Sequence, residues 1–228
     1  MQKPLVRGVS LAGGAILLIL LTLLYFNTRS KEQPAQPAAP SNAPAMVGIL
    51  SSSPKESDSK QSDTEKREAA ASRIRRADVD EFPQLPPGVA SELSRRNCRV
   101  PQPTPDGPLR NVIQGEFFAK GEMGWAVLCS NGKSTTLLVF PNDSGESPEA
   151  LDQTEDSWYA GQDQNGRALY LKEINTVDRN YIVSHYRAYG GPEPPPIDHH
   201  GIDVAFYETA SIILYRYEGK WLRLQGAD

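Results

Sequence analysis

Apolar and polar positions are distributed unevenly along this chain. Apolar residues are crowded into residues 5–26 and again after about residue 82, whereas the stretch between them consists mostly of Pro, Ala, Ser, Lys, Glu and Asp. A hydrophobic core forms only where enough apolar area can be buried. The pattern therefore predicts an N-terminal tail at 1–8, an apolar segment at 9–26, a linker at 27–80 and one globular domain at 81–228.

The apolar run from Val9 to Phe26 is long enough to span a membrane. Its 18 residues correspond to roughly 27 Å of helix, close to the roughly 30 Å hydrocarbon core of a bilayer. A cleaved signal peptide would have a shorter apolar core with a small-x-small site soon after it. The first Ala-x-Ala arrangement is far downstream, at Ala43–Ala45. We therefore expect an uncleaved transmembrane signal anchor, with the membrane as a partner through residues 9–26.

The basic residues around this run are nearly balanced. Lys3 and Arg7 precede it, and Arg29 and Lys31 follow it, so the excess of positive charge that marks the cytoplasmic side is small. The short N-terminal tail and the large polar part behind the run favour a C-terminal domain outside the cytoplasm. We expect a single-pass protein whose domain is periplasmic if the source is a double-membraned bacterium.

The linker at 27–80 has too little apolar area to offset the entropy of ordering it, so we expect a disordered Pro/Ala/Ser/charged tether. Two pieces leave an alternative open, because "MVGIL" is a short apolar island and "TEKREAAASRIRRADV" is rich in helix formers. Without a regular apolar stripe a helix there would be marginal by itself. Either piece would suit a docking site for a partner.

The domain at 81–228 reads as mainly antiparallel β structure. Three runs, 111–118, 124–130 and 134–140, are rich in β-branched and aromatic residues and are joined by short links that contain glycine. Such links are typical of hairpins, and "NGK" is the clearest of them. A short helix is predicted at 88–96, after two prolines. The fold class we expect is α+β, with a small, mostly antiparallel sheet and one or two short helices.

The last strand pair, "ASIILYRYEGKWLRLQ", predicts a hairpin that turns at Glu218–Gly219. Its apolar residues are expected to share one face of the sheet. These residues are Ile212, Leu214, Leu222 and Leu224.

The charge of the domain argues against nucleic acid as a partner. Residues 81–228 carry 13 basic and 20 acidic side chains, a balance of −7, while the whole chain is at −4. Phosphate backbones are bound mainly by Lys and Arg. A domain of this sign without a basic stripe is therefore not expected to bind them.

Cys98 and Cys129 are the only two cysteines. They suit one disulfide in an oxidising compartment, while two free buried thiols or a catalytic thiol stay open as alternatives. In the strand "GWAVLCS", alternation puts Trp125, Val127 and Cys129 on one face. A bridge would then fix the proline-rich segment in front of the sheet to the sheet itself.

The segment "NVIQGEFFAKGEMGWAVLCSNGKSTTLLVF" at 111–140 resembles a single blade segment of the FG-GAP (integrin-propeller-like) repeats. The span from about 85 to 228 resembles uncharacterised bacterial envelope proteins, through "NCRVPQ", "GWAVLCS", "DHHGID" and "GKWLRLQGAD". The FG-GAP resemblance implies a β meander. It does not carry calcium binding, because the loop "AKGEMG" offers Glu122 as its only acid, and one segment does not close a propeller.

The stretch "PPPIDHHGID" at 194–203 is the one candidate for chemistry. Neighbouring residues on an extended chain point to opposite sides, so His200 with Asp198 or Asp203 is a better ligand pair than two adjacent histidines. His185 is the only further histidine that could join a metal site, and a metal-dependent hydrolase that uses Asp198, His199, His200 and Asp203 is one hypothesis. The alternative is a stiff proline-rich loop that ends in a turn at Gly201.

Aromatic residues offer a second kind of site. Trp158, Tyr159, Tyr189 and Trp221 would suit the binding of a peptide, a glycan or another envelope protein, although packing within the sheet also uses such residues. Nucleophile motifs, phosphate-binding glycine loops and paired carboxylates are not recognisable, so we expect no cofactor and favour a non-enzyme. The sequence is thus interpreted as a membrane-anchored extracytoplasmic module that binds or scaffolds, with the metal-dependent hydrolase as the alternative.

Overall fold

The computed structural model describes residues 56–207 and 209–227 of the chain. The predicted tail, the predicted anchor at 9–26 and the linker up to residue 55 lie outside these residues. Among the helices that the structure does describe, none has both the length and the apolar character that crossing a bilayer would need.

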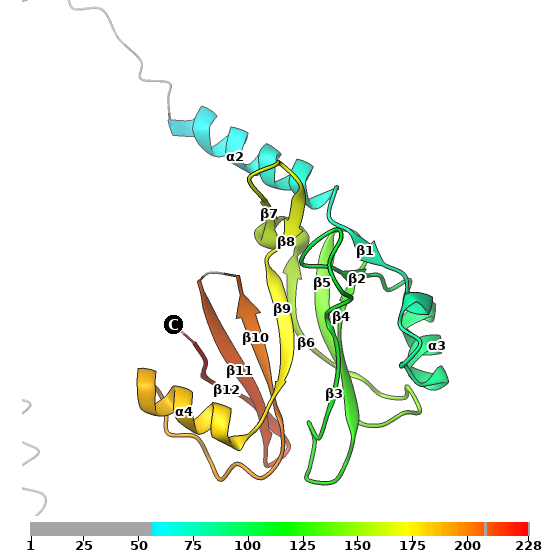
Figure 1. The fold of residues 1–228 in the computed structure, drawn as a ribbon, viewed down its shortest axis with the longest axis vertical. Coiled ribbons are helices and arrows are strands. Elements are labelled where there is room, and N and C mark those ends of the chain that lie inside the picture. Colours follow the sequence, from blue (N-terminus) through cyan, green and yellow to red (C-terminus); the bar gives the residue numbers. More distant parts are fainter. Residues whose placement is uncertain (1–55, 208, 228) are drawn as a thin grey trace, which may run out of the picture. The chain divides into compact units, whose positions relative to one another are not determined.

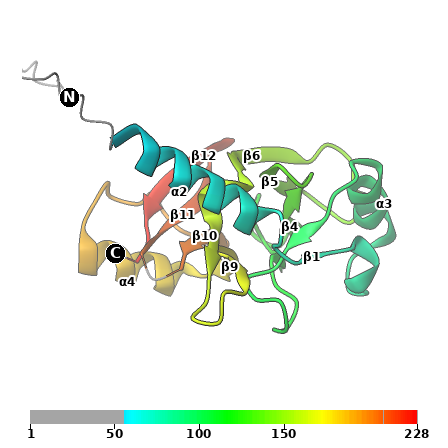
Figure 2. The same cartoon turned by 90° about the horizontal axis from the view of Figure 1, so that it is seen from above.

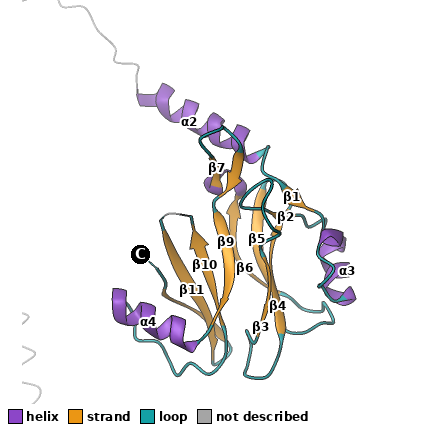
Figure 3. Ribbon diagram, viewed as in Figure 1, coloured by secondary structure: helices purple, strands orange, loops and turns teal. Residues whose placement is uncertain are grey.

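The described part is built mainly from antiparallel strands with a few helices (Figures 1 and 3). The helices are α2 (Glu56–Ala71), α3 (Pro87–Arg95) and α4 (Arg179–Tyr189), with 3-10 turns η1 (Val79–Glu81) and η2 (Asp156–Tyr159). The strands are β1 (Arg76–Ala77), β2 (Val100–Pro101), β3 (Val112–Gly115), β4 (Gly124–Ser130), β5 (Ser134–Phe140), β6 (Glu149–Glu155), β7 (Ala160–Gln162), β8 (Ala168–Tyr170), β9 (Lys172–Val177), β10 (Gly201–Phe206), β11 (Ala210–Tyr217) and β12 (Lys220–Gln225).

Two four-stranded sheets form the body of the fold. The first sheet has the order β3-β4-β5-β6 and the second has the order β12-β11-β10-β9. Two small pairs, β1 with β2 and β7 with β8, accompany them. Every pairing is antiparallel, so the predicted fold class is confirmed in its main feature.

Three buried clusters account for the layering. The first lies between the two sheets and is completed by the end of α2, as the view from above in Figure 2 helps to follow. The second packs α3 on the outer side of the first sheet, and the third packs α4 on the outer side of the second sheet. The order of layers is therefore helix, sheet, sheet, helix.

The predicted meander and both predicted hairpin turns are confirmed. Strands β3, β4 and β5 follow one another as neighbours, and "NGK" turns between β4 and β5. Asn131 Oδ1 accepts hydrogen bonds from the backbone of Lys133 and Ser134, both at 2.9 Å. At the last turn Glu218 and Gly219 both have positive φ, 48° and 76°, which is the backbone of a type I′ hairpin.

The predicted apolar face of the last hairpin is wrong. Leu224 is opposite Ile213 and Leu222 is opposite Tyr215, so the leucines of β12 share a face with the odd-numbered residues of β11. Ile212 and Leu214 point the other way, into the core between the sheets. Since β11 is apolar on both faces, alternation within that strand did not fix the face that β12 continues.

The folded part begins earlier than the predicted boundary at residue 80. Ala70, Ile74 and Ala77 are buried, and β1 pairs with β2. The apolar positions that carry this packing lie near the end of α2 and just after it. They are too few to make a stripe along the helix, which is why the sequence pattern read as a tether.

Cys98 and Cys129 lie at disulfide distance, with their Cα atoms 5.1 Å apart, within the range of native disulfides. Next to them, the backbones of Arg99 and Ser130 exchange two hydrogen bonds of 3.0 and 2.9 Å. As predicted, Trp125, Val127 and Cys129 share the α3 side of β4. The cysteine pair therefore joins the segment after α3 to the first sheet.

Candidate functional site on the α4 side of the second sheet

Helix α4 owes its position to sequence signals at both of its ends. The side chain of Asp178 caps the first turn by accepting a hydrogen bond of 2.9 Å from the backbone of Tyr181, and Gly190 follows the last residue with φ of 76°. Ile182 is the helix residue that is buried against the sheet. These signals override the β-branched and aromatic residues of "NYIVSHYRAY", which by themselves favour a strand.

An aromatic row runs along α4 at the i, i+4, i+8 spacing. The ring centroid of His185 lies 4.0 Å from that of Tyr181 and 5.9 Å from that of Tyr189. His185 Nδ1 is 2.9 Å from the carbonyl oxygen of Tyr181, a contact in which Nδ1 carries the proton and donates it. The row therefore holds the histidine ring in a fixed orientation beside the second sheet.

Strand β10 begins at Gly201, where the sequence pattern predicted a turn. A side-chain carbon at Gly201 would lie 3.0 Å from Ile213 Cγ2 and 3.2 Å from Ile182 Cδ1. The glycine thus allows α4 to approach the sheet closely. The predicted stiff loop ends one residue earlier, because residue 201 is already paired with Val177 of β9.

Asp203 is the acidic residue of β10 and is buried in the second sheet. It is paired with Asn175 on one side and with Ile213 on the other, and it is only 4% exposed. It lines an open groove of about 430 Å³, which we call the α4 groove; Tyr181, Ala205, Tyr207, Ser211 and Ala227 also line it. Asp203 Oδ1 is buried and accepts no hydrogen bond from any described residue.

The surroundings of Asp203 act on its pKa in two directions. Burial raises the pKa of the carboxyl above its ordinary value, and this is the largest effect. The hydroxyls of Ser211 and Tyr181 and the charge of His185 lower the pKa and offset part of the rise. Ser211 is itself held in place by a hydrogen bond of 2.8 Å from the backbone of Ala227 to its Oγ.

Asp198, His199 and Tyr215 form a separate cluster on the other side of Gly201. His199 Nδ1 is 2.7 Å from Asp198 Oδ1 and 2.9 Å from the hydroxyl of Tyr215. The hydrogen bond to His199 is the largest effect on Asp198 and lowers the pKa of that carboxyl. This is an arrangement by which a carboxylate fixes the tautomer of a histidine, although His199 Nε2 is buried and has no hydrogen-bond partner among the residues described.

His200 has a structural role at the edge of the first sheet. Its Nδ1 accepts a hydrogen bond of 3.0 Å from the backbone of Glu116, and its own backbone donates one of 3.1 Å to the Glu116 carbonyl. The ring therefore helps to join the segment before β10 to the segment after β3. Its hydrogen bonds are not shared with Asp198 or with Asp203.

The predicted metal ligands do not form one centre. In residues 56–207 and 209–227, no three His, Cys, Asp or Glu side chains are placed to hold a metal ion together. Asp198 is bonded to His199, His200 is bonded to Glu116, and Asp203 is in the α4 groove with only His185 nearby. The backbone before β10 turns successive side chains in different directions, and β10 itself begins at Gly201. The four predicted ligands are therefore held by different partners.

The four predicted binding aromatics are not one surface either. Trp158 is 67% exposed and Tyr189 is 48% exposed. Tyr159 is stacked on Phe206 at 5.4 Å between ring centroids, and Trp221 packs edge-on against Phe118. Two of the four thus pack within the fold, and the other two lie on different elements, η2 and α4.

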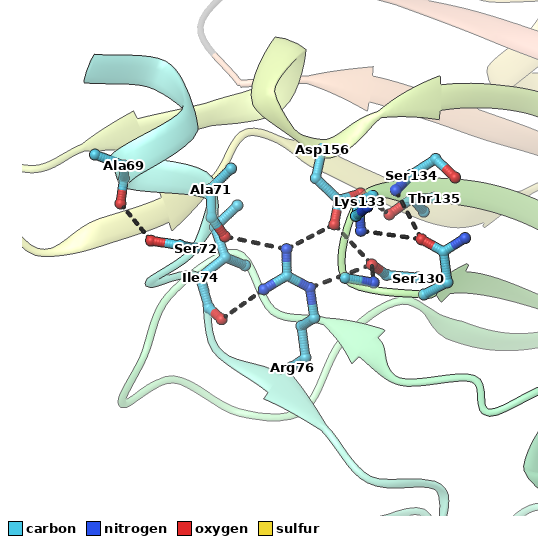
Figure 4. A network of polar contacts seen from close by, with 12 residues as sticks. Ala69, Ala71, Ser72, Ile74, Arg76, Ser130, Lys133, Ser134, Thr135 and Asp156 are labelled. Atoms are coloured by element: carbon cyan, nitrogen blue, oxygen red, sulfur yellow. Dashed lines mark hydrogen bonds and ion pairs between the residues drawn. The ribbon is translucent and has the colours of Figure 1, made fainter. Parts of the chain in front are cut away.

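A second polar network, around Asp156, has every partner it needs (Figure 4). Arg76 Nη2 lies 2.6 Å from Asp156 Oδ2, and the hydroxyls of Ser130 and Thr135 donate to the same carboxylate at 2.7 and 2.6 Å. The remaining Arg76 nitrogens bond to Ser130 Oγ and to the Ile74 carbonyl, and Nη2 also reaches the Ala71 carbonyl. A fully satisfied network of this kind holds structure together and does not offer a free group to a ligand.

Comparison of the chain with family models, with curated proteins and with solved structures finds no match.

Sequence reasoning selected Asp203 and His185 but missed Tyr181 and Ser211. The β-branched and aromatic residues of "NYIVSHYRAYG" predict a strand, and this prediction is wrong because the segment forms α4. On a helix, the spacing of Tyr181, His185 and Tyr189 is the signal for the aromatic row. No sequence signal pointed to Ser211, which is brought to the groove by the pairing of β11 with Ala205 of β10.

Proposed function

We propose that this chain is a membrane-tethered binding module that works outside the cytoplasm and binds its ligand in the α4 groove. The observation that carries the binding function is Asp203, a buried carboxylate that lines an open groove and has an oxygen without a hydrogen-bond partner. Native folds satisfy nearly all of their buried polar atoms. A buried acceptor without a partner, on a residue that lines a groove, is a group to which a ligand with a hydrogen-bond donor could bind.

Two features support the proposed address of the protein, that is, a membrane-anchored position outside the cytoplasm. The apolar run at 9–26 has the length of a membrane span, and the pair of Cys98 and Cys129 at disulfide distance suits an oxidising compartment. In this proposal the segment N-terminal to α2 tethers the sheets to the membrane. Another envelope protein, a peptide or a glycan is the kind of partner that such a module would meet there.

A reporter fusion tests the address directly. A reporter that is active only outside the cytoplasm, fused after Asp228, is expected to be active, and a reporter that is active only in the cytoplasm is expected to be silent. Deletion of residues 9–26 should silence the first and release the protein from the membrane fraction. Activity of the cytoplasmic reporter alone would overturn the proposed address.

Crosslinking tests the binding function in the same cells. A photoreactive amino acid at Tyr207, on the rim of the α4 groove, is expected to give a discrete adduct, while the same group at Met123 is expected to give none. Met123 is a matched control because it is also exposed, at 44% against 64% for Tyr207, and it does not line the groove. Equal adducts at both positions would contradict a specific site in the groove.

A further inference from the structure

Among the described residues, the carboxylates of Asp156 and Asp203 and the ammonium group of Lys172 are buried, and two of these three groups have a partner of opposite charge. Asp156 is paired with Arg76, and Lys172 Nζ lies 2.6 Å from Asp152 Oδ2. Asp203 is the third, and no described cation forms an ion pair with it. An unpaired buried charge is costly, so the ionised form of Asp203 lacks the counter-ion that stabilises the other two groups.

The surroundings of Lys172 show how this fold neutralises a buried charge with its own side chains. The Lys172 side chain is fully buried, and Asp152 takes a positive φ of 47° in the irregular part of β6 where its carboxylate reaches the ammonium group. The ring of Tyr159 lies 5.0 Å from Lys172 Nζ and adds a cation–π contact. A carboxylate and an aromatic ring together therefore form a site for an ammonium ion inside this same chain.

The α4 groove repeats that chemistry without the lysine. It offers the Asp203 carboxylate together with Tyr181 and Tyr207, and among the described residues that line it Asp203 alone has a charged side chain. The hydroxyl of Ser211 is at the same place and can accept a second hydrogen bond. A compact cation that carries several N–H donors would complement this set of groups.

We infer that the α4 groove binds a primary ammonium group, either a small free amine or the lysine side chain or amino terminus of a polypeptide. The ammonium group pairs with the Asp203 carboxylate and lies beside the Tyr181 and Tyr207 rings. A groove of about 430 Å³ is in the size range of small-molecule sites and has room for an alkyl chain behind the ammonium group. This inference rests on the proposed binding function and names the chemistry of its ligand.

The pKa of Asp203 agrees with this assignment. Because burial raises it, an ammonium ion that pairs with the ionised carboxylate would lower it again and release a proton on binding. The other titratable groups that act on Asp203 are Tyr181 and His185 of α4. Protonation of Asp203 removes the negative charge with which the ammonium group pairs, so binding weakens in acid and affinity increases with pH.

The test uses the full chain in non-ionic detergent micelles and three probes of the same length: butylammonium, 1-butanol and butyrate. Saturation-transfer NMR titrations at neutral pH are corrected with protein-free micelles. Butylammonium is expected to bind saturably, while 1-butanol and butyrate are expected to bind at least about tenfold more weakly, since one lost ion pair is worth roughly a factor of ten. Equal binding of butylammonium and 1-butanol would overturn the inference.

Substitutions in the α4 groove test whether butylammonium binds there. Asp203→Asn is expected to reduce butylammonium affinity at least about tenfold, and Tyr207→Ala to reduce it severalfold. Tyr207 is exposed, so its loss leaves the fold intact and keeps the test decisive even if Asp203→Asn perturbs the groove. Glu122→Gln is the matched control, because it also removes one negative charge and Glu122 is exposed outside the groove. Full affinity in Asp203→Asn, or an equal loss in Glu122→Gln, would disprove the site.

A pair of peptides separates the two sources of the ammonium group. One peptide has a single internal lysine and blocked termini, and the other has acetyl-lysine at the same position. Tighter binding of the lysine peptide than of butylammonium would assign a polypeptide ligand, and weaker binding would assign a small amine, with the acetylated peptide inactive in both cases. Equal binding of both peptides would overturn the inference. The reporter fusions are independent of this result, so a wrong address and a wrong ligand are told apart.

Discussion

Arg76 and Asp156 form a buried ion pair across 80 positions of sequence, with Arg76 Nη2 2.6 Å from Asp156 Oδ2. The side chains are only 9% and 1% exposed. The pair joins the segment after α2 to η2 and, through Ser130 and Thr135, to β4 and β5. The part of the chain that reads as a tether is thereby fixed to the first sheet.

Arg76→Ala is expected to destabilise the fold by about 3–5 kcal/mol, because it leaves Asp156 buried without a counter-ion. Arg99→Ala is the matched control, since Arg99 pairs with Asp78 on the surface, with side chains 55% and 62% exposed. Its cost is expected to be below about 1 kcal/mol. Urea denaturation followed by circular dichroism measures both, and equal costs would contradict a structural role for the buried pair.

Gly201→Ala is expected to destabilise the fold by about 1–3 kcal/mol, as an overpacked contact between α4 and the second sheet. The added carbon would lie 3.2 Å from Ile182 Cδ1, and Ile182→Val removes that methyl group. Thermal denaturation of the two single variants and the double variant forms a double-mutant cycle. The double variant should recover part of the loss, and strict additivity would show that this contact is not the cause.

The pH dependence of stability should depend on Asp203 with a defined sign. Because its pKa is raised in the folded chain, the folded chain binds more protons than the unfolded chain above the ordinary aspartate value of about 3.9. The stabilising contribution of Asp203 is fully present below that value and is lost as pH increases through the folded-state pKa. Asp203→Asn should therefore be more stable than the parent at neutral pH, by about 1 kcal/mol, with no advantage in acid.

Asp198→Asn provides a control of opposite sign on the same segment. The pKa of Asp198 is lowered in the folded chain, so its contribution is present above the ordinary value and is lost as pH falls through the folded-state pKa. Denaturation midpoints over a pH series that brackets the ordinary value distinguish the two. The same pH profile for both variants would refute the environment described for Asp203.

Replacement of Cys98 and Cys129 by serine is expected to cost roughly 3–4 kcal/mol if the pair is oxidised, as calculated from the entropy of closing a loop of this length over a separation of 31 residues. A reducing agent should destabilise the parent by a similar amount and leave the double variant unchanged. Mass spectrometry after alkylation of cells measures the redox state directly. Complete alkylation without prior reduction would mean that the thiols are free and would remove one support of the proposed address.

The strands that the sequence predicted best are those whose apolar residues alternate and whose turns carry a specific signal. β4 and β5 with "NGK", and the turn at Glu218–Gly219, are of this kind. β10 was missed because Gly201 and Asp203 interrupt its apolar pattern directly after a proline run, and both residues are there for close packing and for the groove. These are the positions at which local pattern and tertiary role disagree.

Two residues of the candidate site were selected from the sequence, but as metal ligands and not as parts of the α4 groove. Asp203 and His185 were selected, and the structure places them near each other. His200 was not separable from them by sequence, because its bond to Glu116 connects residues 84 positions apart. Hydrogen bonds at such a separation depend on how the two sheets meet, and a pattern within one segment does not contain that information.

The guanidinium group of Arg76 also determines how the fold would respond to a pull from its N-terminal side. Tension on α2 reaches the carbonyls of Ala71 and Ile74, and both are held by Arg76, which is bonded in turn to Ser130 and Asp156. The force is therefore transmitted through Arg76 to the first sheet. The pairing of β1, a strand of two residues, with β2 carries little of it. The resistance of this domain to such a pull therefore depends on one ion pair, so its mechanical strength should fall steeply with Arg76→Ala and little with changes along β1.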